Sequence, residues 1–241
     1  MKPKANPPYK TQNTIYKTQS IATLTPGTLY NNSGNMSTIE IEVKFFLADM
    51  EIVRRMLRLA GARSEGRVFE YNLCFENASR DLNWGESLLR LRKDSKTTLT
   101  YKTRPTEVDS DFKVLKELEV AVSDFDTMQD ILQALGFRQA LVYEKYRETF
   151  TLGSTEICLD SMPFGNFLEI EGQKEDIREL ARQLHMPWRR RILGNYRSMF
   201  TTLKQRLGLG FSDITFDNFR DVDVGIETFL PLFEAGKQIA R

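Results

Sequence analysis

The segment that decides the fold is an alternating run early in the chain, Thr38-Ile39-Glu40-Ile41-Glu42-Val43-Lys44-Phe45. Its apolar residues occupy every second position, and its charged residues occupy the positions between them. Side chains of a β-strand point alternately to its two faces, so this run predicts a strand with one apolar and one charged face. A charged face usually meets water, and one strand alone does not show otherwise.

The same pattern recurs along the chain, which makes a solvated face a poor explanation. Five further charged pairs stand two positions apart, each on one face of its predicted strand: Arg90 and Arg92, Lys102 and Arg104, Glu117 and Glu119, Lys145 and Arg147, and Glu169 and Glu171. We expect these side chains to line one interior, with the apolar faces outside and covered by helices. Such a charged interior is costly unless a ligand organises it.

The predicted strands are sufficient in number to close on themselves. Alternating segments begin near residues 38, 68, 89, 98, 115, 141, 155 and 167 and are mostly joined by short turns. Helical periodicity follows Asp49, Asp124, Lys174 and Asn195. The predicted fold class is therefore α+β, with a closed eight-stranded antiparallel β-barrel and surrounding helices.

The chain is predicted to have three parts. Residues 1–36 are rich in Pro, Asn, Thr, Ser and Lys without an apolar period, which predicts a disordered or mis-started N-terminal extension. Residues 37–207 contain the predicted strands and helices of the domain. Residues 208–241 mix aromatic and acidic residues, and we expect this tail to pack on the outside or to be partly loose.

Composition excludes several classes of function. With 34 Lys and Arg against 33 Asp and Glu, net charge gives no reason to expect a nucleic-acid or membrane partner, and no apolar run of about 18 residues predicts a membrane span. Cys74 and Cys158 are too few for a disulfide framework or a thiolate zinc site. The single histidine, His185, excludes a multi-histidine metal site. We expect a cytoplasmic protein, either a monomer or a homodimer.

The predicted interior has the chemistry of a phosphate site. Carboxylates are the side chains that Mg²⁺ and Mn²⁺ prefer. Lysine and arginine bind phosphate oxygens, and arginine can do so through two parallel hydrogen bonds. Metal and cations together would neutralise charge that develops at phosphorus. The chain has no glycine-rich phosphate loop, so this interior would have to bind the phosphates itself.

Six motifs carry a resemblance to a known family. In order they are Glu40-x-Glu42-x-Lys44, Leu89-Arg90-Leu91-Arg92, Tyr101-Lys102, Lys145-x-Arg147-Glu148, Leu159-Asp160 and Phe167-Leu168-Glu169-Ile170-Glu171. Together they resemble the CYTH superfamily of triphosphate tunnel metalloenzymes over residues 38–205. The resemblance implies a closed eight-stranded tunnel, Mg²⁺ or Mn²⁺ as cofactor, and a small-molecule triphosphate as substrate.

The resemblance also implies roles for single residues. The implied metal-binding residues are Glu40, Glu42, Glu117, Glu119, Asp160, Glu169 and Glu171. The implied triphosphate-binding residues are Lys44, Arg90, Arg92, Lys102, Arg104, Lys145, Arg147 and, on a late helix, Arg191. The implied catalytic residues are Glu42, Lys44, Glu119 and Asp160.

Three functions fit this site. The first is hydrolysis of inorganic triphosphate, a nucleoside triphosphate or thiamine triphosphate, in which water attacks the terminal phosphorus. The second is that of a class IV adenylyl cyclase, in which the ribose 3′-hydroxyl of ATP attacks the α-phosphorus and pyrophosphate leaves. Better-known class IV cyclases carry a His-Phe pair before the first motif, whereas this chain has Asn35-Met36-Ser37-Thr38, which favours hydrolysis. The third is a non-catalytic polyphosphate or nucleotide-binding module, which would not need the complete carboxylate set.

Overall fold

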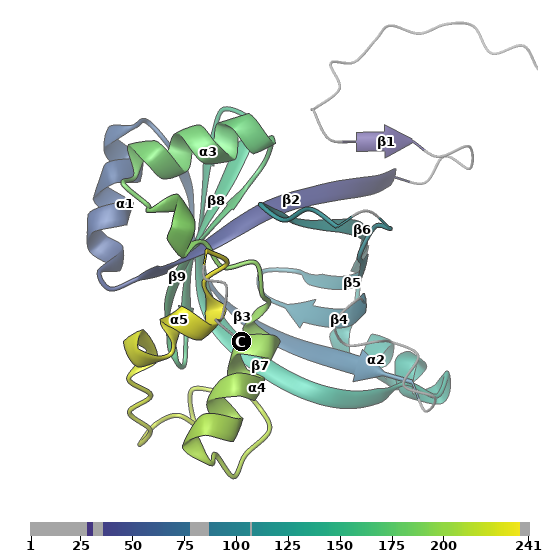
Figure 1. The fold of residues 1–241 in the computed structure, drawn as a ribbon. Helices are drawn as coiled ribbons and strands as arrows, with labels where there is room; N and C mark the ends of the chain where they lie inside the picture. The colour runs from purple at the N-terminus through teal and green to yellow at the C-terminus, as the bar shows by residue number, and fades with distance from the viewer. Residues whose placement is uncertain (1–27, 31–35, 78–86, 107, 237–241) are drawn as a thin grey trace, which may run out of the picture.

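The computed structural model of the chain describes residues 28–30, 36–77, 87–106 and 108–236 (Figure 1). Of the predicted N-terminal extension, only Thr28–Tyr30 and Met36 are among them. Thr28–Tyr30 forms strand β1, which pairs antiparallel with residues 36–38. The rest of residues 1–36 lies outside the described residues, and so does the last part of the C-terminal tail.

Eight antiparallel strands form a closed ring, as predicted. In chain order they are β2 (Met36–Leu47), β3 (Arg63–Glu76), β4 (Ser87–Lys93), β5 (Thr97–Thr103), β6 (Lys113–Val122), β7 (Arg138–Leu152), β8 (Thr155–Met162) and β9 (Gly165–Glu171). Neighbours around the ring run β2-β6-β5-β4-β3-β7-β8-β9, and β9 pairs again with β2. Since every strand of the ring has two neighbours, the ring leaves no long open edge.

Strand β2 closes the ring because its two halves pair with different strands. Residues 38–42 pair with β6, and residues 42–47 pair with β9. Glu42 stands opposite both Lys113 of β6 and Glu171 of β9, and Lys44 stands opposite Glu169. The quoted alternating run is thus the seam of the ring (Figure 1), and its charged residues face those of both neighbouring strands.

The helices begin and end close to where the sequence predicts. They are α1 (Met50–Leu59), α2 (Phe125–Ala134), α3 (Lys174–Gln183), α4 (Tyr196–Leu207) and α5 (Leu230–Phe233), with 3₁₀ turns at Trp188–Arg190 and Ile226–Thr228. Asp49, Asp124 and Asn195 accept hydrogen bonds from backbone N–H groups in the first turns of α1, α2 and α4, as N-cap residues do. Gly208 ends α4 in the left-handed conformation, at φ 67°.

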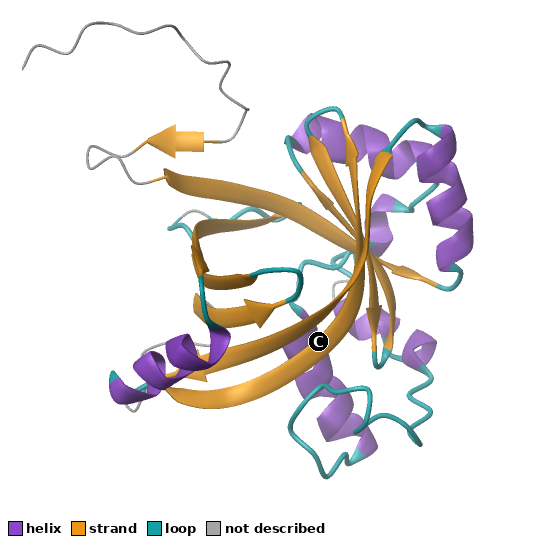
Figure 2. Cartoon of the chain, turned by 180° about the vertical axis from the view of Figure 1, so that it is seen from behind, coloured by secondary structure: helices purple, strands orange, loops and turns teal. Residues whose placement is uncertain are grey.

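Three apolar clusters hold helices on the outside of the ring. α1 and α3 cover the outer face of β2, β8 and β9 (Figure 2), where Val53 and Ile177 join the buried cluster that contains Val43 and Ile170. α2 covers Leu73, Leu91 and their neighbours. Each fully buried Leu, Ile or Val contributes about 1.5–3 kcal/mol.

The helical cover is incomplete, which corrects one expectation. The sequence predicts that helices cover the whole apolar outside, but Tyr101, Leu118 and Val120 of β5 and β6 are 36%, 41% and 56% exposed. α1, α2 and α3 follow β2, β6 and β9, and none of the three clusters includes these positions on β5 and β6.

No helix in the described part of the chain is long and apolar enough to span a membrane.

The segment after α4 packs closely against the ring over its described part. Ile214 accepts a hydrogen bond from the backbone of Glu144 and donates one to that of Val142, at 2.9 and 2.8 Å, so it pairs with a part of β7 that β8 does not reach. Ile214, Phe219 and Leu230 are 0%, 5% and 2% exposed. They belong to the apolar cluster that also buries the inner face of α4.

Candidate functional site

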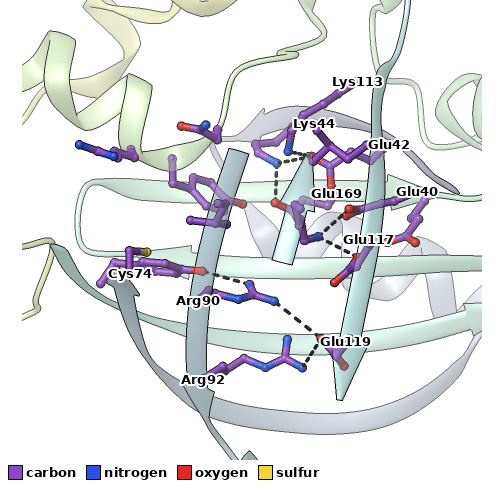
Figure 3. Close-up of a pocket in the computed structure, with 18 of the residues that line it drawn as sticks. Glu40, Glu42, Lys44, Cys74, Arg90, Arg92, Lys113, Glu117, Glu119 and Glu169 are labelled. Atoms are coloured by element: carbon purple, nitrogen blue, oxygen red, sulfur yellow. Dashed lines mark hydrogen bonds and ion pairs between the residues drawn. The ribbon is translucent and has the colours of Figure 1, made fainter. Parts of the chain in front are cut away.

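A cavity of about 450 Å³ lies inside the ring, with walls from all eight of its strands and from the start of α4 (Figure 3). Among the described residues, ten lysine and arginine side chains and seven glutamates line it. The cations are Lys44, Arg90, Arg92, Lys96, Lys102, Arg104, Lys113, Lys145, Arg147 and Arg197, and the glutamates are Glu40, Glu42, Glu117, Glu119, Glu156, Glu169 and Glu171. The lining therefore carries an excess of positive charge, which suits a highly anionic ligand.

One face of each strand accounts for most of this lining. Residues 40, 42 and 44 of β2, 113, 115, 117 and 119 of β6, and 141, 143, 145 and 147 of β7 all reach the cavity. Each set has a spacing of two, which places its members on one face of a strand. The charged faces predicted from the sequence thus meet inside the ring.

Lys44 lies at the centre of the seam and is almost completely buried, at 1% exposed. Its Nζ donates a hydrogen bond to Glu169 and lies 3.6 Å from Glu42 Oε1. Burial opposes the ionised form of both glutamates. The nearby ammonium groups outweigh it, however, and hold the pKa of Glu42 and of Glu169 well below the ordinary value. Lys113 contributes to this at Glu42, where Nζ lies 2.6 Å from Oε1.

A second group of charges lies beneath the cavity wall on β7. Arg147 binds Asp160 through two hydrogen bonds of 2.7 and 2.6 Å, and Lys145 Nζ donates to the same carboxylate at 2.9 Å. Glu70 is 1% exposed, and its oxygens lie 3.5 Å from Lys145 Nζ and 3.7 Å from Arg147 Nε. Burial opposes ionisation, but the neighbouring Lys145, Arg147 and Arg92 lower the pKa of Glu70 to about 2. Two buried carboxylates therefore fix the directions of two cavity cations.

Two arginines of β4 form a third group. Arg90 donates to Tyr143 Oη at 3.1 Å and to Thr100 Oγ1 at 3.3 Å. Arg92 NH2 lies 3.9 Å from Glu119 Oε2, which also accepts a hydrogen bond of 2.8 Å from Thr100. The nearest carboxylate to Arg92 is that of Asp94, 3.1 Å from its Nε. NH1 and NH2 of Arg92 make only long contacts with carboxylates, at 3.8 and 3.9 Å, and are available to an anion in the cavity.

One corner of the cavity carries carboxylates without enough positive charge nearby. Burial, followed by the charges of Glu40, Glu42 and Glu156, raises the pKa of Glu171 to about 9. Within the described part of the chain, the side-chain carboxylate of Glu171 forms neither a hydrogen bond nor an ion pair. Burial also raises the pKa of Glu40 to about 7, although Lys102 Nζ lies 2.6 Å from its Oε2. A cation is the partner that this corner lacks.

The donor set of this corner fits a hard divalent cation. Glu40, Glu42 and Glu171 supply oxygen ligands from adjacent strands. Among the described residues, no three acidic, cysteine or histidine side chains are already grouped closely enough to bind one ion. Mg²⁺ commonly takes only one or two carboxylates and completes its shell with water and phosphate oxygens. The corner therefore fits a metal that arrives with a phosphate ligand.

The structure brings most of the predicted site residues to the cavity and places two elsewhere. Asp160 is fully buried and is absent from the lining, because Arg147, Lys145 and Tyr196 occupy its oxygens. Arg191 also lies outside the lining: it donates to Asp111 Oδ1 at 2.7 Å and to the carbonyl groups of Ser110, Asp111 and Trp188. Neither side chain therefore lies where it would contact a metal or phosphate in the cavity. Arg104 lines the cavity at an exposed position.

Sequence reasoning missed several residues of the site. Lys113 stands on the same face of β6 as Glu117 and Glu119, so its spacing of four and six residues was a usable indication. Glu70 shares a face of β3 with Asn72, and both are buried. Tyr196 is the first residue of α4, in the helical segment that the sequence predicts after Asn195. No local pattern indicated that its hydroxyl would reach a buried carboxylate.

The comparison with protein families identifies the family to which this fold belongs. The model of the CYTH domain matches residues 38–187. The chain belongs to the CYTH domain family. The matched residues contain all eight strands of the ring apart from the first two residues of β2, and they end before α4.

Individual relatives agree with this assignment. The chain is 30% identical over 143 residues to the protein named "Putative adenylate cyclase MJ0240" of Methanocaldococcus jannaschii, covering 58% of this chain and 81% of that protein. A solved structure of the PH1012 protein from Pyrococcus horikoshii is 29% identical with a TM-score of 0.53, covering 61% and 91% of the two chains.

Two more distant structures share the fold. One, called a "putative adenylate cyclase" from Vibrio parahaemolyticus, has a TM-score of 0.60 at 20% identity and covers 68% of this chain and 98% of its own. The other, "Putative adenylyl cyclase HpAC1 from Hippeastrum", has a TM-score of 0.52 at 18% identity and covers 68% and 95%. The latter is described as having a dominant triphosphatase activity.

Proposed function

We propose that this CYTH-domain protein is a divalent-cation-dependent enzyme that hydrolyses the terminal phosphoanhydride bond of a triphosphate, namely inorganic triphosphate, a nucleoside triphosphate or thiamine triphosphate. The observation that carries the proposal is the composition of one enclosed cavity. Ten cationic side chains line it together with a corner in which Glu40 and Glu171 lack sufficient positive charge. A triphosphate with a divalent cation has both of the charges that this cavity is built to receive.

The cations of the wall would bind and orient the phosphate chain. Lys44, Lys145 and Arg147 are held in fixed directions by buried carboxylates. Arg90 and Arg92 on β4, together with Lys102, approach from the other side of the ring, and Arg104 adds a cation at an exposed position of the lining. Preorganised cations of this kind stabilise charge that develops on phosphoryl oxygens during transfer.

The glutamate corner would bind the divalent cation, and the attacking water would be coordinated to that cation. Glu40, Glu42 and Glu171 are the proposed ligands, and Glu169, Glu117 and Glu119 are further carboxylates of the lining. When bound, Mg²⁺ or Mn²⁺ neutralises phosphate charge and lowers the pKa of a coordinated water. In the free protein Glu40, whose pKa is raised to about 7, would release its proton when the cation binds, because a coordinating carboxylate must be deprotonated.

The lining favours the phosphate chain over a nucleobase. Among its described residues the only aromatic side chains are Tyr143 and Tyr196. The Tyr143 hydroxyl accepts a hydrogen bond from Arg90, and the ring of Tyr196 faces two lysine ammonium groups. Neither ring is a free stacking surface for adenine. This supports hydrolysis of inorganic triphosphate over cyclisation of ATP, and the activity described for the Hippeastrum protein agrees with it.

Adenylyl cyclase activity is the second candidate. It is favoured by the names of the Methanocaldococcus relative and of the Vibrio structure, the second of which shares the fold of this chain. A nucleotide in the cavity could present its α-phosphate to the same corner. Its ribose 3′-hydroxyl would then replace water as the nucleophile, and pyrophosphate would leave.

A substrate panel tests the proposal. Purified protein is supplied with inorganic triphosphate, ATP, GTP or thiamine triphosphate and with Mg²⁺ or Mn²⁺, and both orthophosphate and cyclic AMP are measured. We expect orthophosphate from inorganic triphosphate and its loss in Glu169→Gln. Cyclic AMP with pyrophosphate would establish the second candidate. Tight binding of triphosphate without any product would indicate a binding module.

A further inference from the structure

Tyr196 connects the buried part of the site to α4, beyond the residues matched by the CYTH domain model. It is the first residue of α4, it is 8% exposed, and it lines the cavity. Its ring packs against Phe164 and Phe167 with centroid separations of 6.3 and 5.3 Å. A core role would account for these apolar contacts but not for the polar ones.

The hydroxyl of Tyr196 completes the set of donors around Asp160. It donates to Asp160 Oδ2 at 2.8 Å, beside Lys145 Nζ at 2.9 Å and Arg147 NH2 at 2.6 Å. Asp160 has no exposed surface, so it has no contact with solvent. Four hydrogen bonds from three residues thus converge on one carboxylate and fix the positions of both β7 cations.

The ring of Tyr196 faces two cavity lysines from different strands. Lys44 Nζ lies 4.6 Å and Lys145 Nζ lies 5.6 Å from its centroid. β2 and β7 are not neighbours, because β9 and β8 lie between them in the ring. An ammonium group over an aromatic face is attracted by the negative π-face of the ring. Tyr196 is therefore a common contact for two ammonium groups that no backbone pairing joins.

We propose that Tyr196 is a positioning residue that sets the locations of the Lys44 and Lys145 ammonium groups for binding of the triphosphate, through its ring and through its hydrogen bond to Asp160. The inference rests on the proposed function only for the identity of the anion. It assigns to α4, which lies outside the matched domain, control over how tightly the cavity binds phosphate.

Three variants separate positioning from packing. Tyr196→Phe keeps the ring and removes the hydroxyl, and Tyr196→Leu removes both. Phe200→Leu is the matched control, since Phe200 lies one turn further along α4, is 3% exposed and belongs to the same apolar cluster. Each variant is measured by urea unfolding, by calorimetric titration with inorganic triphosphate, and by steady-state kinetics with KM and kcat resolved.

We expect Tyr196→Leu to raise the Kd and KM for inorganic triphosphate about tenfold, from loss of the cation–π contacts and the charge-assisted hydrogen bond. Tyr196→Phe should raise them about threefold, because only the hydrogen bond is lost. Phe200→Leu should lower the free energy of unfolding about as much as Tyr196→Leu does, while its Kd and KM stay within about twofold of wild type. Equal Kd values in Tyr196→Leu and Phe200→Leu would overturn the inference.

A readout without substrate separates this inference from the proposed function. The rates at which Lys44 and Lys145 react with acetic anhydride are followed by mass spectrometry in all four proteins. We expect both rates to rise in Tyr196→Leu and to stay at the wild-type level in Phe200→Leu. If wild type binds no triphosphate, the proposed function fails, and unchanged labelling rates in Tyr196→Leu would then refute the positioning role independently.

Discussion

Glu171→Gln is the most informative single substitution, because Glu171 is a half-buried carboxylate beside three others. Burial and the charges of Glu40, Glu42 and Glu156 raise its pKa from 4.5 to about 9. In the metal-free folded protein it therefore keeps a proton over a pH range in which the unfolded chain has released it. The folded state binds more protons between pH 4.5 and about 9, so the free energy of unfolding falls as pH rises through that interval.

The size of this effect follows from the shift. One pKa unit corresponds to about 1.4 kcal/mol, so a rise from 4.5 to about 9 corresponds to about 6 kcal/mol. Because Glu171 is only half-buried, solvent and salt reduce this figure, and we expect about 2–3 kcal/mol between pH 5 and pH 9. For a chain of this length that is a shift of about 5–10 °C in Tm.

Urea unfolding at pH 5, 7 and 9 in the presence of EDTA measures this term. Glu171→Gln has no proton to lose, so it should lose about 2–3 kcal/mol less than wild type between pH 5 and pH 9. Glu227→Gln, at an exposed position, is the control and should follow wild type. Excess Mn²⁺ should restore wild type at pH 9, because metal binding replaces the proton, and it should restore Glu171→Gln less.

Parallel pH dependences for wild type and Glu171→Gln would refute the reasoning. They would mean that the carboxylates of this corner do not interact in the folded protein. An equal response of both proteins to Mn²⁺ would mean that the cation binds elsewhere.

Further substitutions test the rest of the site. Glu42→Gln and Glu169→Gln should lower turnover by at least about 100-fold while inorganic triphosphate binds as tightly or more tightly, because the lining gains positive charge, as measured by phosphate release and calorimetry. Lys44→Met removes one of the cationic partners of two buried carboxylates, Glu42 and Glu169, so we expect a raised Kd and a loss of about 3 kcal/mol in urea unfolding. Arg92→Ala should raise the Kd about tenfold and also lower the free energy of unfolding by about 1–3 kcal/mol, because Glu70 and Asp94 lose a cationic neighbour. Arg191→Ala should lower the free energy of unfolding by about 2–4 kcal/mol with an unchanged KM, since its partners lie outside the cavity.

Specific results would contradict each expectation. Wild-type turnover in Glu42→Gln or Glu169→Gln would mean that these carboxylates do not serve the reaction. An unchanged Kd in Lys44→Met or Arg92→Ala would place the phosphate chain elsewhere. A raised KM with full stability in Arg191→Ala would return that residue to the site from which its contacts separate it.

The ring could be predicted because its information is local and repeated. The alternation around Glu42 recurs in each later strand, and N-cap residues such as Asp49 and Asp124 mark the helices. That the strands close into a ring could be predicted from their number and from the charged face that they share. The incomplete helical cover over Leu118 could not be predicted, because it depends on where the helices dock on the closed ring.

The site was predictable at the cavity surface and not below it. Lys44 and Arg147 follow from the pattern of alternate charged residues. Asp160 is also an acidic residue within one of the six motifs. Its oxygens nevertheless accept hydrogen bonds from Lys145, Arg147 and Tyr196, and it does not line the cavity. Tyr196 reaches it from a helix 36 residues later in the chain. Such contacts depend on tertiary packing, which spacing along one strand does not encode.

Hydrolysis of a triphosphate and cyclisation of ATP break different bonds, so the products show which reaction the protein catalyses. ³¹P NMR can follow inorganic triphosphate and, in a separate sample, ATP with the protein and Mg²⁺ or Mn²⁺. If the protein hydrolyses the terminal phosphoanhydride bond, we expect equal amounts of orthophosphate and pyrophosphate from inorganic triphosphate, and neither product when Glu169→Gln replaces wild type. Unchanged inorganic triphosphate in the presence of folded wild-type protein, with ATP converted to cyclic AMP and pyrophosphate, would contradict it.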